Sequence, residues 1–368
     1  MSILIFVIIL LVLVLAHEFG HFFTAKRFGI RVDEFGFGFP PKLFGIKRGE
    51  TEYTVNLLPL GGFVKIFGES PDEENINGAD ASRSFVNKPK WQQAIVLVAG
   101  IFANFLLAWL LFSIGFMSGL PASVNSGNNY ALTDVNLVVI SVDAGSPAFN
   151  AGLKSGDKIV SLMYTNTKNE TEDVKEINPN SLKKFVTEHG DKELSIGYIR
   201  GKNNEFHVAK VTPKYANNSP IIGISMDEIG TAKLPFFKAF YEGGKFTLSI
   251  TKNTITGLYG LIKDAVMGKG SFAGVTGPVG MVGIVGDAYQ FGFVYLLSFA
   301  ALISINLGVI NLIPFPALDG GRLFFLLIEK IKGSPITPKI ANTANMIGFG
   351  LLLLLMAIVT YHDIVKLF

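Results

Sequence analysis

The stretch LVLVLAHEFGHFF (Leu11–Phe23) places two histidines and a glutamate at the end of an apolar N-terminal run. An ionisable side chain inside a membrane span costs roughly 2.5–3.5 kcal/mol on insertion scales, so these residues need a functional reason to be there. The spacing His-Glu-x-x-His supplies one. On a helix, His17 and His21 lie four residues apart on one face, so both imidazoles can reach the same metal ion.

The composition indicates a membrane protein. Of the 368 residues, 49% are hydrophobic and only 17% are charged, whereas charged residues approach a quarter of an ordinary soluble chain. Several apolar segments are close to the 20 or so residues that a helix needs to cross a bilayer. No basic stretch or small-residue cleavage site precedes the histidines, which favours a retained span over a signal peptide. We predict four transmembrane helices, within 1–25, 93–118, 291–319 and 340–362.

The distribution of lysine and arginine predicts the orientation. These residues gather after the first span and between the last two, but none occurs in 91–153 or 270–321. The positive-inside rule therefore places 26–92 and 320–340 in the cytoplasm, and both termini and 120–290 outside. The net charge of +3 gives no support for a nucleic-acid partner, and the absence of cysteine excludes thiolate metal sites.

The segments between the predicted spans have different patterns. In the cytoplasmic loop 26–92, residues 52–69 alternate apolar side chains around Pro and Gly-Gly, which predicts a β-hairpin or two short strands against the membrane face. Residues 134–214 predict a small α/β domain with strands near 136–142, 158–162, 193–200 and 205–212. Residues 234–290 are amphipathic, which favours an interfacial segment, with the glycine-rich 277–286 forming a bend before the third span.

The His-Glu-x-x-His motif has two simple explanations, a chance match or histidines that are satisfied by hydrogen bonds inside a helical bundle. The functional interpretation is a catalytic zinc site. Such a site uses three protein ligands and keeps a position open for water, so a third ligand must come from elsewhere in the chain. Glu18, next to a ligand but free of the metal, is the predicted general base.

One carboxylate is the best candidate for the third ligand. In NLIPFPALDGGRL (Asn311–Leu323), two prolines break the third span near its cytoplasmic end and Asp319 follows. A broken helix can fold the chain back and present a carboxylate at membrane depth. The alternative is that Asp319 only caps the next helix. The presence of a His-Glu-x-x-His motif at the same membrane face favours the ligand.

Three motifs, HEFGH, LPLGGFVKI (Leu58–Ile66) and NLIPFPALDGGRL, resemble those of the site-2 protease family of intramembrane zinc metalloproteases, and the sequence is most similar to its bacterial regulator-of-sigma-E-protease branch. The resemblance implies a zinc ion held by His17, His21 and Asp319, with Glu18 as the catalytic base. It further implies two sets of substrate-binding residues. Asn311 and Pro314 would shape the substrate region, and a membrane-associated β-element, which would pair with an extended substrate strand, would comprise Gly61, Gly62, Phe63, Val64 and Lys65.

The resemblance also implies that 134–214 is a PDZ domain, to which SPAFNAGLKSGDKIVSL (Ser146–Leu162) is similar, with a peptide as its candidate ligand. The best-known Gram-negative members carry two such domains, whereas this chain has room for one. The expected fold is thus a polytopic α-helical membrane protein of four transmembrane helices, with one inserted extracytoplasmic α/β PDZ-like domain and a membrane-associated β-hairpin. The expected location is the bacterial cytoplasmic (inner) membrane.

The leading functional prediction is an intramembrane zinc endopeptidase that cleaves single-span transmembrane proteins in or near the membrane. A second hypothesis is a catalytically silent membrane scaffold whose PDZ-like domain captures extracytoplasmic C-termini. A third is a transporter or channel with a metal site, which the lack of polar residues along the other predicted spans disfavours. The sequence does not distinguish between anti-sigma factors and signal-peptide remnants as substrates.

Overall fold

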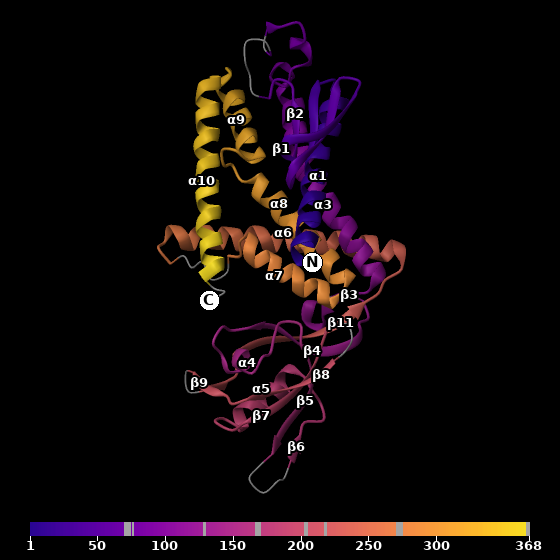
Figure 1. The fold of residues 1–368 in the computed structure, drawn as a ribbon, viewed down its shortest axis with the longest axis vertical. Helices are drawn as coiled ribbons and strands as arrows, with labels where there is room; N and C mark the ends of the chain where they lie inside the picture. The colour runs from indigo at the N-terminus through magenta and orange to yellow at the C-terminus, as the bar shows by residue number, and fades with distance from the viewer. Residues whose placement is uncertain are drawn as a thin grey trace. The chain divides into compact units, whose positions relative to one another are not determined.

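The structure is a computed structural model in which the chain divides into two compact units (Figure 1). The first unit comprises Met1–Ile114, Phe240–Gly286 and Leu296–Phe368, and the second comprises Gly115–Ala239 and Asp287–Tyr295. The structure describes residues 1–69, 75, 77–127, 130–165, 171–201, 205–216, 219–269 and 275–365.

Within the described residues, four helices are long and apolar enough to cross a membrane: α1 (Ser2–Arg27), α3 (Lys90–Ser118), α8 (Phe293–Leu312) and α10 (Pro338–Val365). They coincide with the four predicted apolar segments. The third is shorter than expected, since α8 ends at Leu312 and the chain turns at Pro314 and Pro316, which cannot continue a helix.

A long β-hairpin follows α1. Strand β1 (Val32–Arg48) pairs antiparallel with β2 (Thr51–Ile66), and β2 packs along α1. The hairpin predicted inside 52–69 is therefore one strand of a larger hairpin. Its partner β1 was not predicted, because the run FGFGFPP has the glycines and prolines of a loop. Several register shifts accommodate these residues within the ladder.

Three further helices belong wholly or mainly to the first unit: α6 (Phe236–Val266), α7 (Pro278–Phe291) and α9 (Asp319–Lys332). Helix α6 is amphipathic, as predicted for 234–290, of which 270–274 lie outside the described residues. The bend predicted for 277–286 is instead most of α7. The buried carboxylate of Asp363 on α10 caps this helix, because it accepts hydrogen bonds from the backbone N–H groups of Gly277 (3.2 Å) and Gly280 (2.9 Å).

The second unit is built on an antiparallel sheet with the strand order β3-β11-β4-β5-β7-β8, in which β6 also pairs with β5. The same unit contains helices α4 (Pro147–Asn150) and α5 (Pro179–Glu188). It also contains a separate two-stranded sheet, in which β9 (Lys214–Ala216) pairs with β10 (Ser219–Ile221). The sheet strands are β3 (Leu120–Ser123), β4 (Thr133–Val142), β5 (Lys158–Thr165), β6 (Thr171–Asp173), β7 (Leu194–Arg200), β8 (Glu205–Val211) and β11 (Ile224–Ala232). A single 3-10 turn at Val124–Ser126 also belongs to this unit, whereas those at Ala81–Arg83 and Phe85–Asn87 belong to the first unit.

The strands predicted within 134–214 are present, and their inward side chains form one apolar core with α5. Leu162, Leu182 and Ile196 in this core are completely buried or nearly so. The compact unit nevertheless extends beyond 134–214 in both directions, because β3 and β11 add to the sheet beside β4.

Candidate metal centre

Helix α1 presents both motif histidines on its buried face. His17 and His21 are 9% and 6% exposed, and their Nε2 atoms lie 3.1 Å apart. The two rings meet edge to face with centroids separated by 4.7 Å. The four-residue spacing thus brings two ring nitrogens together, as the helical period predicts.

The third candidate ligand arrives at the start of α9. After α8 ends, Asp319 occupies the first turn of α9, where a carboxylate is favoured by the helix dipole. The two glycines that follow permit this tight turn. A Cβ at Gly320 would lie 2.3 Å from the backbone oxygen of Ile313, and one at Gly321 would lie 2.1 Å from that of Phe315. The two glycines are therefore required by close backbone packing, and this packing sets the position of the preceding carboxylate.

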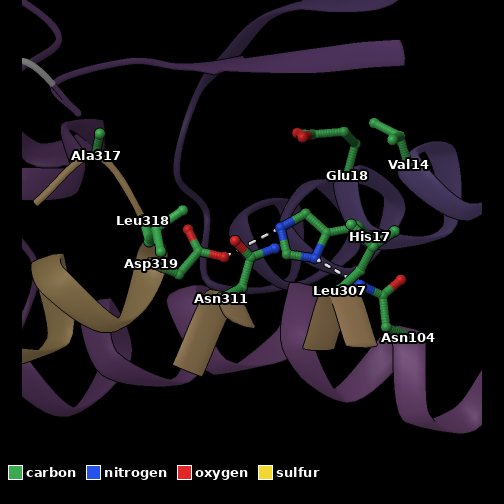
Figure 2. A pocket seen from close by; sticks show the side chains of 9 residues that line it. All are labelled: Val14, His17, Glu18, Asn104, Leu307, Asn311, Ala317, Leu318 and Asp319. Atoms are coloured by element: carbon green, nitrogen blue, oxygen red, sulfur yellow. Dashed lines mark hydrogen bonds and ion pairs between the residues drawn. The ribbon is translucent and has the colours of Figure 1, made fainter. Parts of the chain in front are cut away.

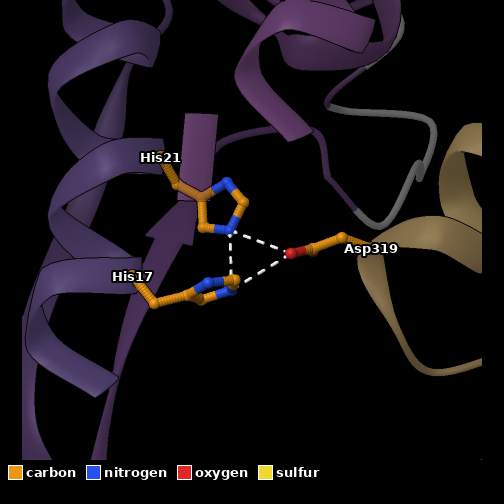
Figure 3. Close-up of side chains that lie close together, drawn as sticks. All are labelled: His17, His21 and Asp319. Carbon is orange, nitrogen blue, oxygen red and sulfur yellow. Dashed lines mark hydrogen bonds and ion pairs between the residues drawn. The ribbon is translucent and has the colours of Figure 1, made fainter. Parts of the chain in front are cut away.

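The three side chains converge on one point (Figure 3). Asp319 Oδ2 lies 3.0 Å from His17 Nε2 and 3.3 Å from His21 Nε2. Ligands on a tetrahedral zinc ion with bonds of about 2.0–2.1 Å are separated by about 3.3 Å, which is close to these spacings. Oδ2 is also buried between the two imidazole nitrogens, and a cation held among the three atoms would compensate the charge of the carboxylate. The donor set of two imidazoles and one carboxylate fits zinc.

Helix α3 contacts the two histidines through their Nδ1 atoms. His21 Nδ1 lies 2.8 Å from the backbone oxygen of Val96, and His17 Nδ1 lies 3.2 Å from Asn104 Nδ2. The helices approach closely because the contact positions are glycines. A Cβ at Gly20 would lie 2.3 Å from the backbone oxygen of Ala99.

A cavity of about 270 Å³ opens beside two of the ligand candidates, His17 and Asp319 (Figure 2). The candidate base Glu18 lines it, and the backbone N–H of Val64 on β2 donates a 3.0 Å hydrogen bond to Glu18 Oε2. The cavity thus combines a place for a metal with a carboxylate that faces the same space. The full lining is Val14, His17, Glu18, Asn104, Leu307, Asn311, Ala317, Leu318 and Asp319.

Of the remaining candidate residues from the sequence, some line or contact the cavity and others do not. Asn311 lines the cavity, whereas Pro314 is exposed in the turn that follows α8 and is not part of the lining. Residues 61–65 all lie on β2. Of these, Val64 contacts the site through its backbone, and Phe63 stacks on Phe39 of the neighbouring strand β1.

Sequence reasoning missed Asn104, which is completely buried, lines the cavity and contacts His17. The signal was available, because Asn104 carries the only side-chain amide in the uncharged stretch 94–120. A polar side chain in an apolar span requires a partner, so it marks a position of functional interest.

Comparison with known proteins assigns the chain to a family. Residues 5–355 match peptidase family M50. The chain is similar to the regulator of sigma-W protease RasP of Bacillus subtilis (31% identity, covering 100% of this chain and 99% of that protein). It is also similar to the zinc metalloprotease RasP of Geobacillus kaustophilus (30%, covering 100% and 98%) and to protease RseP of Yersinia pestis (30%, covering 98% of each). The chain therefore belongs to peptidase family M50, the site-2 protease family, and is a zinc metalloprotease.

Proposed function

We propose that this zinc metalloprotease is an intramembrane endopeptidase that cleaves single-span transmembrane proteins in or near the lipid bilayer. His17, His21 and Asp319 hold the zinc ion, and Glu18 is the catalytic base. The observation that carries this proposal is the convergence of the three ligand atoms, 3.0–3.3 Å apart, on helices that are separated by almost 300 positions of sequence.

When bound, zinc supplies a Lewis acid that polarises the scissile carbonyl and makes water acidic enough to be deprotonated near neutral pH. Glu18 faces the same cavity, and its carboxylate takes a proton from the attacking water and passes it to the leaving amine. The backbone N–H of Val64 holds this carboxylate in place through Oε2. The two histidine ligands are oriented by α3.

The substrate is proposed to bind as an extended strand along 61–65 of β2. A transmembrane helix buries its peptide bonds in its own hydrogen bonds, so it must unwind before cleavage. Strand addition replaces those bonds with bonds to the enzyme backbone. Because Val64 contacts Glu18 directly, a strand aligned here lies beside the base. Asn311 lines the cavity and is a candidate to bind the substrate backbone.

The four apolar helices are proposed to span the bacterial cytoplasmic membrane, with both termini and residues 134–214 outside. In this proposal 134–214 is a PDZ domain that either takes a peptide ligand or limits the size of substrates. The candidate substrates are anti-sigma factors and signal-peptide remnants. A catalytically silent scaffold is the alternative, and it gives no reason for a carboxylate oxygen buried within 3.3 Å of two histidine nitrogens.

The test is to measure zinc content and cleavage of a synthetic transmembrane helix on the same purified samples. The unmodified protein should contain about one zinc per chain. Glu18→Gln should retain the zinc and lose cleavage by about 10²–10⁴-fold, as expected for removal of a general base. His21→Ala and Asp319→Asn should lose both. Undiminished cleavage by Glu18→Gln, or full zinc content in His21→Ala and Asp319→Asn, would contradict the assigned roles.

A further inference from the structure

Asn104 is a buried amide whose hydrogen bonds are incomplete. Its side chain is fully buried on α3, where it lines the cavity beside the candidate zinc ligands (Figure 2). Its Nδ2 atom lies 3.2 Å from His17 Nδ1, while its Oδ1 atom has no hydrogen-bond partner among the described residues. A buried acceptor without a partner costs about 1–3 kcal/mol, so a different arrangement of this amide is expected.

The ligand chemistry of His17 specifies that arrangement. His17 Nε2 is the atom that faces Asp319 and His21, so it must be free of a proton to bind zinc. The ring proton then resides on Nδ1, which becomes a donor and needs an acceptor. Rotating the Asn104 amide by half a turn exchanges its nitrogen and oxygen and puts Oδ1 opposite Nδ1. The same rotation gives the oxygen a hydrogen-bond donor and moves Nδ2 to the position that Oδ1 now occupies.

We propose that Asn104 is a positioning residue of the zinc site, which accepts a hydrogen bond from His17 Nδ1–H through Oδ1 and thereby fixes the tautomer that binds zinc through Nε2. This inference rests on the ligand roles given under the proposed function. It goes beyond them because it assigns a specific chemical task to a residue that binds neither metal nor substrate.

The neighbouring histidine has an equivalent acceptor on the same helix. His21 Nδ1 lies 2.8 Å from the backbone oxygen of Val96, eight residues before Asn104 on α3. Residues 96, 100 and 104 recur at intervals of four, so they share one face of the helix. Ser304 of α8 contacts the same helix through its backbone only, because its hydroxyl donates a 2.8 Å hydrogen bond to the backbone oxygen of Asn104. One helix thus orients both imidazoles, one through its backbone and one through a side chain.

Two substitutions that keep the branching of the side chain at Cγ distinguish this role from simple packing. Asn104→Asp keeps an acceptor opposite His17 Nδ1, as in the carboxylate–histidine–zinc triads of other zinc sites, but it buries a charge. Asn104→Leu fills the space with an apolar group and removes the acceptor. A packing role predicts that the leucine variant is tolerated better, whereas the positioning role predicts the reverse order.

The experiment measures zinc release to a chromophoric chelator from purified, zinc-loaded protein in detergent. Asn104→Leu should lower zinc affinity by about 10–100-fold, as is typical when such an outer hydrogen bond is lost. Asn104→Asp should stay within about threefold of the unmodified protein. Ser304→Ala is the matched control, because it loosens the same helix contact without touching the amide, and it should leave zinc affinity unchanged.

Either variant decides the question if the other does not fold. Folded Asn104→Leu with unchanged zinc affinity overturns the proposal, and so does folded Asn104→Asp that loses zinc by tenfold or more. His17→Ala is measured alongside. If it keeps its zinc, the ligand assignment itself fails. If it loses zinc while Asn104→Leu does not, only the positioning role is refuted.

Discussion

Gly100 leaves the space that the ring of His21 occupies. A Cβ on this residue would lie 2.2 Å from His21 Nε2 and 2.6 Å from Cε1, distances that no folded protein tolerates without movement. The ring is held on its other side by the Val96 carbonyl, so it has little freedom to move away. A single methyl group at this position therefore acts directly on a proposed zinc ligand.

We expect Gly100→Ala to lower zinc affinity by roughly tenfold or more, because overpacking strain of about 1–3 kcal/mol would fall on the ligand ring. The measurement is zinc content after dialysis against a weak chelator. Gly257→Ala on α6 is the control, because nothing lies within 4 Å of its Cβ position. That variant should keep its zinc and gain up to about 1 kcal/mol of helix stability. Equal zinc retention by both variants would refute the steric argument.

At the scale of elements, the turn between strands β1 and β2 forms ion pairs with two other segments of the chain. Glu50 in this turn forms ion pairs with Lys26 at the end of α1 (2.6 Å) and with Arg83. Partial burial favours the neutral form of the Glu50 carboxyl, but the hydrogen bonds from Lys26 and Arg83 outweigh it and lower the pKa of Glu50 below its usual value of 4.5. The two cations thus stabilise the ionised carboxylate in the folded protein.

This pairing predicts a pH-dependent part of the stability. Because the folded-state pKa of Glu50 is lowered, its contribution is complete well above pH 4.5 and is lost as the pH falls through the folded-state pKa. Glu50→Gln should therefore have a lower melting temperature than the unmodified protein at pH 7, and the two melting curves should converge in acid. The measurement is thermal unfolding between pH 7 and pH 3.5. A gap between the two proteins that stays constant with pH would contradict this account.

At the scale of the whole molecule, the candidate site belongs entirely to the first unit, although the chain leaves that unit for more than 120 residues between Ile114 and Phe240. If the four apolar helices span the membrane, an even number of crossings returns both termini to the same side. In the loop residues that directly flank the four helices, lysine and arginine then lie on one side, in 26–92 and 320–340, and are absent from 91–153 and 270–321.

This arrangement predicts the outcome of reporter fusions. A reporter that is active only in the cytoplasm should be active when fused within 65–90 and inactive when fused within 160–200. A reporter that is active only outside should give the opposite result. The same compartment for both fusion sites would refute the proposed topology.

The sequence predicted what depends on local pattern. Residue type and periodicity were sufficient to predict the apolar segments, the histidine spacing and the strands of 134–214. The sequence did not predict features that depend on distant partners. Strand β1 contains Pro40 and Pro41 and is identified only by its pairing with β2. Strands β3 and β11 lie outside the predicted domain and add to its sheet from either side in sequence.

The site shows the same division. His17 and His21 follow from the helical period. Asp319 was proposed from the broken third span at the same membrane face and then from the motif resemblance, since no local pattern determines which carboxylate folds back. Asn104 was overlooked for a related reason. Its role depends on an imidazole that is 87 residues away in sequence, and no short-range pattern records that neighbour.

The late position of Asp319 bears on how the enzyme is made. A ribosome that has translated through α8 has already released both histidines and Glu18, yet the nascent polypeptide still lacks its third ligand. Only the residues after Leu312, about 15% of the 368-residue chain, are then still to be made. A chain that stops before Asp319 lacks the third proposed ligand and should not cleave its neighbours.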